Sequence, residues 1–415
     1  MSVLATPVDR PVRLRAVTSL LGPAFVTAVA YVDPGNVATN VAAGSRYGYL
    51  LLWVVLLANA MAAVMQYLSA KLGVATGRSL PELLGDRLPA GGRIGFWLQA
   101  ELVMMATDLA EVLGGAIALQ VLLGLPLLAG GLVTGGVSLA LLITHGQRQR
   151  SFEQLVTGFL VVIAAGFLVG FLVGAPPPGE LAAGLLPRLA DSRSVLLTAS
   201  ILGATMMPHA VYLHSALARD RFPSVPPHRQ RQVLRTVRWD VGAAMLLAGT
   251  VNATMLVMAG GLLRGSAAAD SLAEVPAALD GTVGGLVGLS FALALLASGV
   301  ASTSVGCLAG QVVMGGLLRR TVPVLARRLV ALAPGLLVLG CGADPTLALV
   351  LSQVVLSFGI PFAVIPLVRL TARRSVMGPA VNHRATTVAA AGITGVVVVV
   401  NVLLIGLTAG AAQLW

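Results

Sequence analysis

Eleven long apolar runs constrain the fold of this chain more than any other feature of its sequence. They lie at about 14–43, 48–72, 94–123, 126–145, 152–174, 194–217, 236–263, 284–318, 322–342, 345–370 and 385–412. A helix needs roughly 20 apolar residues to cross the ~30 Å hydrocarbon core of a bilayer. Only 10% of the 415 residues are charged, against about 25% in soluble domains. We therefore expect an all-α polytopic membrane protein, with eleven transmembrane helices in a single domain over residues 1–415.

The positions of the basic residues predict how the chain crosses the membrane. If the N-terminus is cytoplasmic and each run reverses the side, all but four of the 27 Lys and Arg residues fall inside. The exceptions are Arg46, Arg188, Arg193 and Arg264. This bias follows the positive-inside rule and predicts an external C-terminus for a multi-pass protein of the bacterial inner (plasma) membrane. It also accounts for the net charge of +11, so no nucleic-acid partner is expected.

Two of the runs carry a matched interruption in mid-span. The first contains Ala-Tyr-Val-Asp-Pro at 30–34, and the sixth contains Ala-Thr-Met-Met-Pro at 204–208. Proline removes a backbone donor and clashes with the preceding turn, so helices 1 and 6 are expected to break. Paired breaks in two halves of a chain are the best sequence pointer to a transporter's midplane binding site. The spacing predicts a 5+5 inverted repeat, about 14–174 and 194–370, with 385–412 as one extra helix.

The residues at the breaks are suited to holding a metal ion. Asp33 is an ionisable group in an apolar span, and Asn36 follows within reach of the same point. Where the helices unwind, carbonyls such as those of Ala30 and Ala204 lose their intrahelical partners and can coordinate a cation. Met207 adds a thioether. Mg²⁺ and Ca²⁺ require oxygen ligands only, whereas softer transition-metal ions also accept sulfur.

The same residues carry a resemblance to a known family. Asp33-Pro34-Gly35-Asn36 together with Met207-Pro208-His209 resembles the Nramp family of proton-coupled divalent-metal transporters, over nearly the whole chain. The resemblance implies a LeuT-like fold that imports Mn²⁺, and also Fe²⁺, Co²⁺ or Cd²⁺, with protons by alternating access. It implies a monomer that is not an enzyme and that holds no permanently bound cofactor. It further implies that Asp33, Asn36, Met207 and the carbonyls of Ala30 and Ala204 bind the metal, with Gln353 close by.

A second set of charged residues predicts a path for protons. Glu101, Asp108 and Glu111 in the third run share a stripe about 80° wide on one helix face. Carboxylates at that depth need a polar path or a basic partner. We expect a relay with the members Asp33, His209, Glu111, Asp108, Glu101, Arg327 and Arg328, similar to the route proposed for Nramp proteins. A purely structural salt-bridge network remains the alternative.

Other transport classes fit the sequence less well. A sodium-coupled symporter of the same fold has no need for Met207 or for the acidic stripe. A channel needs a ring of filter residues, and a metal sensor needs a soluble output domain; neither is visible. The chain has no Walker motif, HExxH or GxSxG, which disfavours an ATP-driven pump or an intramembrane hydrolase.

Overall fold

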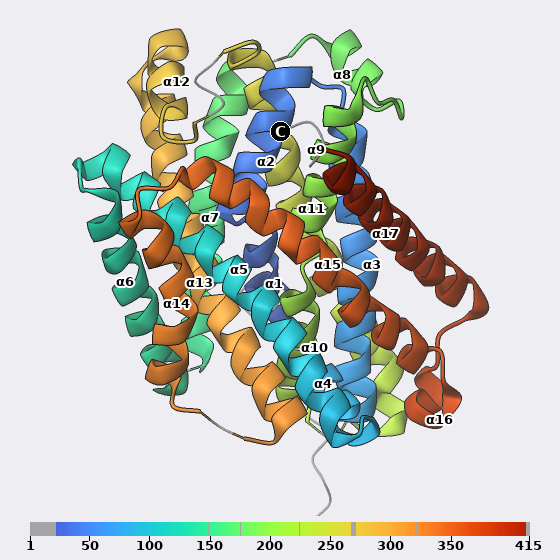
Figure 1. Cartoon of the computed structure of the whole chain (residues 1–415). Coiled ribbons are helices and arrows are strands. Elements are labelled where there is room, and N and C mark those ends of the chain that lie inside the picture. The colour runs from blue at the N-terminus through green and yellow to red at the C-terminus, as the bar shows by residue number, and fades with distance from the viewer. Residues whose placement is uncertain are drawn as a thin grey trace, which may run out of the picture.

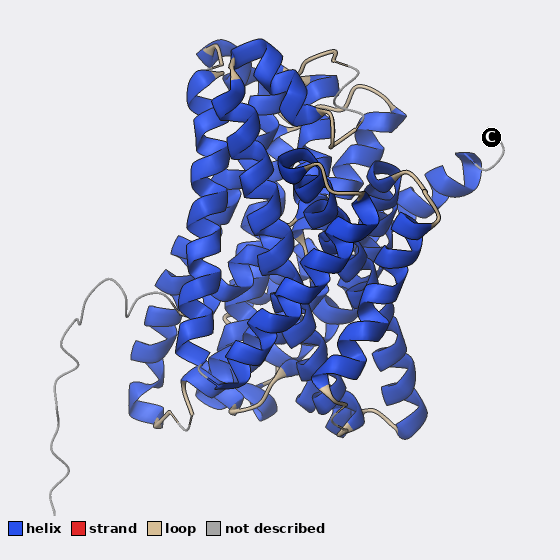
Figure 2. Ribbon diagram, turned by 90° about the vertical axis from the view of Figure 1, so that its left-hand side faces the viewer, coloured by secondary structure: helices blue, strands red, loops and turns tan. Residues whose placement is uncertain are grey.

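The computed structural model describes residues 22–147, 149–174, 176–223, 225–266, 271–320 and 322–411. Within these ranges the chain forms helices joined by short loops and no strands (Figure 2). Residues 1–21 lie outside the described part, and so do the predicted cytoplasmic N-terminus and the start of the first run at about 14. The last residues, 412–415, also lie outside it.

Described helices fall on all eleven predicted runs. The first run is divided into α1 (Pro23–Ala28), the 3-10 turn η2 (Val29–Val32) and α2 (Pro34–Tyr47). The sixth is divided into α9 (Ser192–Thr205) and α10 (Pro208–Arg221). The others are α3 (Leu52–Thr76), α5 (Ala90–Leu123), α6 (Leu127–Gln147), α7 (Gln149–Val173), α11 (Pro227–Leu262), α13 (Gly285–Leu318), α14 (Val324–Gly340), α15 (Pro345–Thr371) and α17 (Arg384–Ala411). In the described part, eight spans are long and apolar enough to cross a membrane by length and composition, with α9 and α10 taken together.

Short helices occupy segments that the sequence presents as connections. They are α4 (Leu80–Arg87), α8 (Pro178–Gly184), α12 (Val275–Val283), α16 (Arg374–Met377) and the turn η4 (Gly378–Ala380). Local capping explains α4: the Ser79 side chain accepts from the Glu82 N–H, and the Glu82 carboxylate accepts from the Ser79 N–H, a reciprocal capping box. Figure 1 shows α4 and α16 at one end of the bundle and α8 and α12 at the other. We call these the α4 end and the α12 end.

Glycines allow the helices around the breaks to pack closely. A Cβ on Gly299 of α13 would lie 2.9 Å from the backbone oxygen of Glu111 on α5. A Cβ on Gly44 of α2 would overlap the backbone oxygen of Leu256 on α11. Small residues at such crossings are typical of helix packing in membranes, where van der Waals contact replaces the hydrophobic drive. The result is a tightly packed surround for the two interrupted helices.

Candidate functional site

The first break is organised by Asp33. This residue has extended backbone angles (φ −70°, ψ 167°) between η2 and α2. Its Oδ1 atom accepts from the Asn36 backbone N–H at 2.8 Å and from the Asn36 side-chain nitrogen at 2.6 Å. The carboxylate therefore caps α2, as an acidic side chain does at a helix N-terminus. Its second oxygen, Oδ2, is buried and has no hydrogen-bond partner among the described residues.

The second break is organised by the two methionines before Pro208. Met206 (φ −93°, ψ 56°) ends α9, and Met207 (φ −66°, ψ 116°) precedes α10. No side chain caps the N-terminus of α10. The side chain of Met207 is fully buried, so its thioether faces the interior of the bundle and not the surrounding lipid.

Asn36 joins the two breaks. Its side-chain nitrogen donates to the Ala204 carbonyl at 2.9 Å as well as to Asp33. The Thr205 hydroxyl approaches the Asn36 side-chain oxygen at 3.4 Å. The amide NH₂ group of Asn36 thus lies between a carboxylate and a carbonyl, where its partial positive charge is favourable. A cation placed between the same two oxygens would find the same electrostatic environment.

Gln353 brings a third helix to this point. It lies on α15 and is fully buried, and a Cβ on Gly35 would overlap its amide nitrogen. Its side-chain oxygen has no hydrogen-bond partner in the described structure. Ala30 is also buried. The structure therefore brings the six predicted metal-site residues to the interior of the bundle, with two side-chain oxygens there left unsatisfied.

Two arginines of α14 pair with the acidic stripe of α5. Arg328 donates to Asp108 at 2.7 Å and to the Ser138 hydroxyl at 2.6 Å. Arg327 donates to Glu101 at 3.1 Å. Arg328 and Asp108 are 0% and 1% exposed. A charge at this depth is costly unless it is paired. Each ion pair therefore neutralises two groups that would be costly to bury alone, whether in lipid or in the protein core.

Glu111 and His209 are members of the expected relay whose side chains form no hydrogen bond in the described structure. Both are buried, and neither side chain has a hydrogen-bond partner among the described residues. The Glu111 carboxylate lies beside Gly306 of α13. No hydrogen-bonded chain from Asp33 to Asp108 is present in the described part. The relay therefore stays a prediction, and proton movement along it would need water or a side-chain rearrangement.

Several polar residues that hold the first broken helix were not assigned to the site from the sequence. The Gln66 side chain donates to the Tyr31 hydroxyl and also contacts the His214 ring nitrogen Nδ1. On α11, the Asp240 carboxylate accepts from the backbone N–H groups of Gly22 and Ala24 at 3.1 and 3.3 Å, at the start of α1. Polar residues inside apolar runs are the sequence feature that could have pointed to them.

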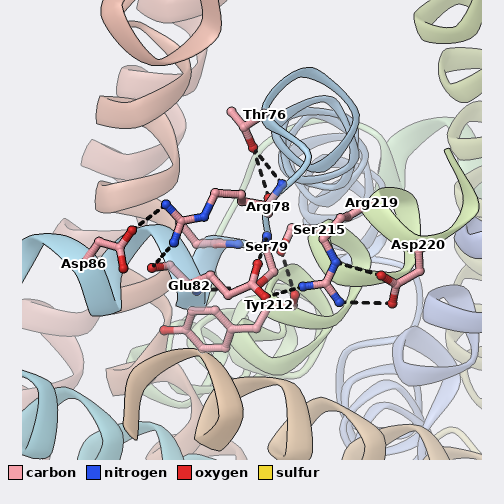
Figure 3. Close-up of polar contacts among 10 residues, drawn as sticks. Thr76, Arg78, Ser79, Glu82, Asp86, Tyr212, Ser215, Arg219 and Asp220 are labelled. Carbon is pink, nitrogen blue, oxygen red and sulfur yellow. Dashed lines mark hydrogen bonds and ion pairs between the residues drawn. The ribbon is translucent and has the colours of Figure 1, made fainter. Parts of the chain in front are cut away.

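Beyond the site, α10 is tied to the helix α4 (Figure 3). Arg219 forms an ion pair with Glu82, and the Leu80 N–H donates to the Ser215 hydroxyl at 2.9 Å. Partial burial raises the pKa of Glu82, but hydrogen bonds from Ser79 and Arg219 outweigh it and leave the pKa below its usual value. These contacts fix the α4 end of the second broken helix.

Asp86 connects α4 to a further helix. It pairs with Arg78 and, at 2.7 Å, with Arg319 at the end of α13. Its hydrogen bond with Arg78, followed by the Arg319 contact, holds the pKa of the Asp86 carboxyl below its ordinary value. In this way α4 links α10, α13 and the loop after α3.

Comparison with known proteins gives consistent matches along the chain. The profile of the Nramp family, described as natural resistance-associated macrophage protein-like, matches residues 24–407. A Mycobacterium tuberculosis protein named divalent metal cation transporter MntH is 55% identical over 403 residues, which are 96% of this chain and 94% of that protein. The Bacillus subtilis protein of the same name is 42% identical over 393 residues, 94% of this chain and 92% of that one.

Solved structures match as well. The manganese transporter of Eremococcus coleocola superimposes with a TM-score of 0.85 at 30% identity, covering 92% of this chain and 85% of that one. A nucleobase-cation-symport-1 family transporter superimposes with a TM-score of 0.59 at 17% identity, covering 97% of this chain and 92% of the other. This second likeness concerns the fold alone.

Proposed function

The chain belongs to the Nramp family, and from that membership we propose that it imports divalent transition-metal ions, Mn²⁺ foremost, together with protons. The support is the length of the family match, residues 24–407, and the names of the relatives, which are divalent metal cation and manganese transporters. Import proceeds by alternating access around the two breaks, since paired broken helices at the midplane are how such folds expose one site to either side.

The metal site consists of Asp33, Asn36, Met207 and the carbonyls of Ala30 and Ala204, with Gln353 beside them. The observation that carries this assignment is the Oδ2 atom of Asp33, which is buried and has no hydrogen-bond partner among the described residues. A buried carboxylate oxygen without a partner is costly, and either a cation or a proton relieves that cost. Fe²⁺, Co²⁺ and Cd²⁺ fit the same mixed oxygen and sulfur ligands.

Asn36 must change orientation when an ion enters. In the structure its NH₂ group faces Asp33 and the Ala204 carbonyl, and an amide nitrogen is no ligand for a cation. A half-turn about the last side-chain bond presents the amide oxygen instead. Metal binding then releases two oxygen acceptors to the ion in one motion.

Protons share the site because the Asp33 carboxylate can bind either a proton or a metal ion. Binding of one lowers its affinity for the other. From Asp33 the proposed route passes His209 and Glu111 and reaches the ion pair of Asp108 with Arg328. The side chains of His209 and Glu111 are buried and have no hydrogen-bond partner in the part of the chain that the structure describes, so each can accept a proton without first breaking a hydrogen bond. Asp108→Asn is expected to lower proton movement more than Mn²⁺ movement; proportional loss of both favours a purely structural network.

We assign the α4 end to the cytoplasm, which follows from the predicted distribution of Lys and Arg. The protein then lies in the cell membrane with an external C-terminus. It functions as a monomer without a permanently bound cofactor, and its partners are the metal ion, protons and the bilayer. Crosslinking of the purified protein in nanodiscs tests the monomer.

The decisive test is uptake into proteoliposomes that contain a pH-sensitive dye. Mn²⁺, Ca²⁺ and Mg²⁺ are supplied separately to the wild type, to Asp33→Ala and to the control Glu274→Ala, which removes an exposed carboxylate near α12. We expect Mn²⁺ uptake with internal acidification in the wild type and the control, and neither in Asp33→Ala. Uptake driven by Na⁺, or Mn²⁺ uptake by Asp33→Ala equal to the wild type, contradicts the proposal.

A further inference from the structure

Three consecutive carbonyls precede Asp33 where the first broken helix unwinds. They belong to Ala30, Tyr31 and Val32, at the end of η2 and directly before Asp33. A 3-10 turn has about three residues per turn, so successive carbonyls are spread roughly 120° apart around its axis. Each of them is a candidate ligand for an ion next to Asp33, and each is a hard oxygen donor.

The Tyr31 carbonyl is already occupied by α11. The side-chain nitrogen of Asn252 donates to it at 2.7 Å. The orientation of that amide is fixed in turn, because Asn40 on α2 donates to the Asn252 side-chain oxygen at 2.9 Å. Asn252 and Asn40 are only 1% and 2% exposed, so water does not compete for these bonds.

The Val32 carbonyl is occupied by a different helix, α13. The hydroxyl of Ser298 donates to it at 2.6 Å, and Ser298 is fully buried. In contrast, no described side chain donates to the Ala30 carbonyl. Side chains of neighbouring helices therefore hold two of the three carbonyls, and the Ala30 carbonyl has no such side-chain donor in the described structure.

We infer that Asn252 and Ser298 are positioning residues that withdraw the Tyr31 and Val32 carbonyls from the ion and so set the metal selectivity of the site. This inference rests on the proposed function and adds a reason for selectivity other than the thioether. Asn252 and Ser298 limit the number of oxygen ligands at the first break, whereas Met207 provides a sulfur ligand at the second.

The number of oxygen ligands decides between the ions. Ca²⁺ takes 6–8 oxygen ligands at 2.3–2.6 Å in a flexible shell. Asp33 and Asn36 supply one oxygen each in the simplest arrangement, and Ala30 and Ala204 supply their carbonyls. Releasing the carbonyl of Tyr31 or of Val32 would raise the set from four oxygens to five, nearer to the six at which Ca²⁺ binding begins. Holding them back keeps the site short of oxygens and favours an ion that accepts sulfur.

The test compares Ser298→Val with Ser298→Thr. The two replacements have the same shape, and only threonine retains the hydroxyl that can donate to Val32. Ser304→Ala is the control, because Ser304 is a buried serine of the same helix whose hydroxyl bonds within α13, to the Val300 carbonyl. Asn252→Ala tests the second bond independently.

Mn²⁺ uptake into proteoliposomes is measured over a concentration series, with and without Ca²⁺ as competitor. For Ser298→Val and Asn252→Ala we expect the inhibition constant of Ca²⁺ to fall about tenfold, the usual effect of one buried hydrogen bond. The KM for Mn²⁺ should rise while kcat changes little, since the change is in ground-state binding. Ser298→Thr and Ser304→Ala should match the wild type.

A wild type that transports Mn²⁺ while Ser298→Val keeps its Ca²⁺ inhibition constant overturns this inference and leaves the proposed function standing. Equal effects in Ser298→Thr and Ser298→Val also overturn it, because packing and not the hydroxyl would then be responsible. A wild type that transports no Mn²⁺ is the separate failure of the proposed function. Thermal unfolding of every variant in detergent identifies any that is misfolded. If Ser298→Val or Asn252→Ala is misfolded, Mn²⁺ binding is compared instead in the milder variants Ser298→Thr and Asn252→Gln.

Discussion

The two breaks are built from the same local rule but differ in how firmly they are held. At the first, Asp33 caps the following helix, and Asn252 and Ser298 hold the preceding carbonyls. At the second, no side chain caps α10, and the residue in the equivalent position is Met207. Methionine is flexible and polarisable. One break is a rigid set of hard oxygens, and the other is an adaptable soft donor.

A similar contrast appears at the α4 end of the same two helices. The start of α1 is held by backbone N–H groups that donate to the single carboxylate of Asp240. The end of α10 is held by Arg219 and Ser215 through α4. The first contact is one partly buried carboxylate on a long helix, and the second is a more exposed set of polar contacts on a short helix. The second is therefore the more sensitive to salt.

The largest expected effect tests the charge of the first break. Asp33→Asn keeps the shape of the side chain and an acceptor for the Asn36 N–H, but it removes the carboxylate. We expect Mn²⁺ uptake to fall by about a hundredfold or more, since loss of outer-shell partners alone costs about 10–100-fold at metal sites. Uptake in proteoliposomes measures this. Retention of more than a tenth of wild-type uptake would contradict the role of the charge.

The next prediction compares packing at the two breaks. A Cβ on Gly203 would lie 2.8 Å from the backbone oxygen of Gln353, whereas one on Gly35 would meet the mobile end of the Gln353 side chain. Overpacking against backbone costs about 1–3 kcal/mol. Gly203→Ala should therefore lower thermal stability more than Gly35→Ala, which should instead impair uptake by displacing Gln353. Thermal unfolding in detergent measures this. If Gly35→Ala proves less stable than Gly203→Ala, the proposed difference in packing between the two breaks is wrong.

A smaller effect tests the soft donor at the second break. We expect Met207→Ala to reduce discrimination against Ca²⁺ by about five- to tenfold, because the ion loses its sulfur ligand and water takes its place. Mn²⁺ entry should fall less than that. The measurement is the ratio of Mn²⁺ to Ca²⁺ uptake, with Met207→Leu as a control for side-chain volume. Equal ratios in the wild type and both variants would show that the thioether has no part in selectivity.

The smallest effect concerns the tie between α10 and α4. The pKa of Glu82 is below its usual value, so its stabilising contribution is present above the unfolded pKa and is lost as the pH falls through the folded pKa. Glu82→Gln should lower stability at pH 7 by less than about 1 kcal/mol, as expected of a partly exposed ion pair.

Unfolding of wild type and Glu82→Gln as a function of pH checks this point. The difference between them should begin to shrink as the pH falls through about 4.3, the pKa of the unfolded carboxyl, and should vanish only below the lower folded pKa. Asp220→Asn is the matched control, because Asp220 pairs with the same Arg219 but lies on α10 itself and joins no other element. A difference that persists in acid would mean that Glu82 acts through packing and not through its charge.

Much of the fold could be predicted from the sequence because the bilayer imposes long apolar runs. The predicted runs and the two broken helices are present in the described structure. The short helices α4, α8 and α12 were not predicted, since each is too short to show an apolar period, and only α4 among them has a capping box. The ends of helices differ for the same reason: α2 continues to Tyr47 and α10 to Arg221, where only packing decides how far a helix extends.

The candidate site, too, could be predicted from the sequence only in part. Asp33 and Asn36 are three residues apart and Met207 precedes a proline, so the local sequence alone indicates a cation site with one soft ligand. Asn252 and Ser298 contact residues 221 and 266 positions away, and a polar residue in an apolar run does not reveal its partner. The sequence determined which atoms are available at each break, because local chemistry sets them. Only the tertiary structure decided which carbonyls remain free for an ion, because that depends on helices brought together by packing.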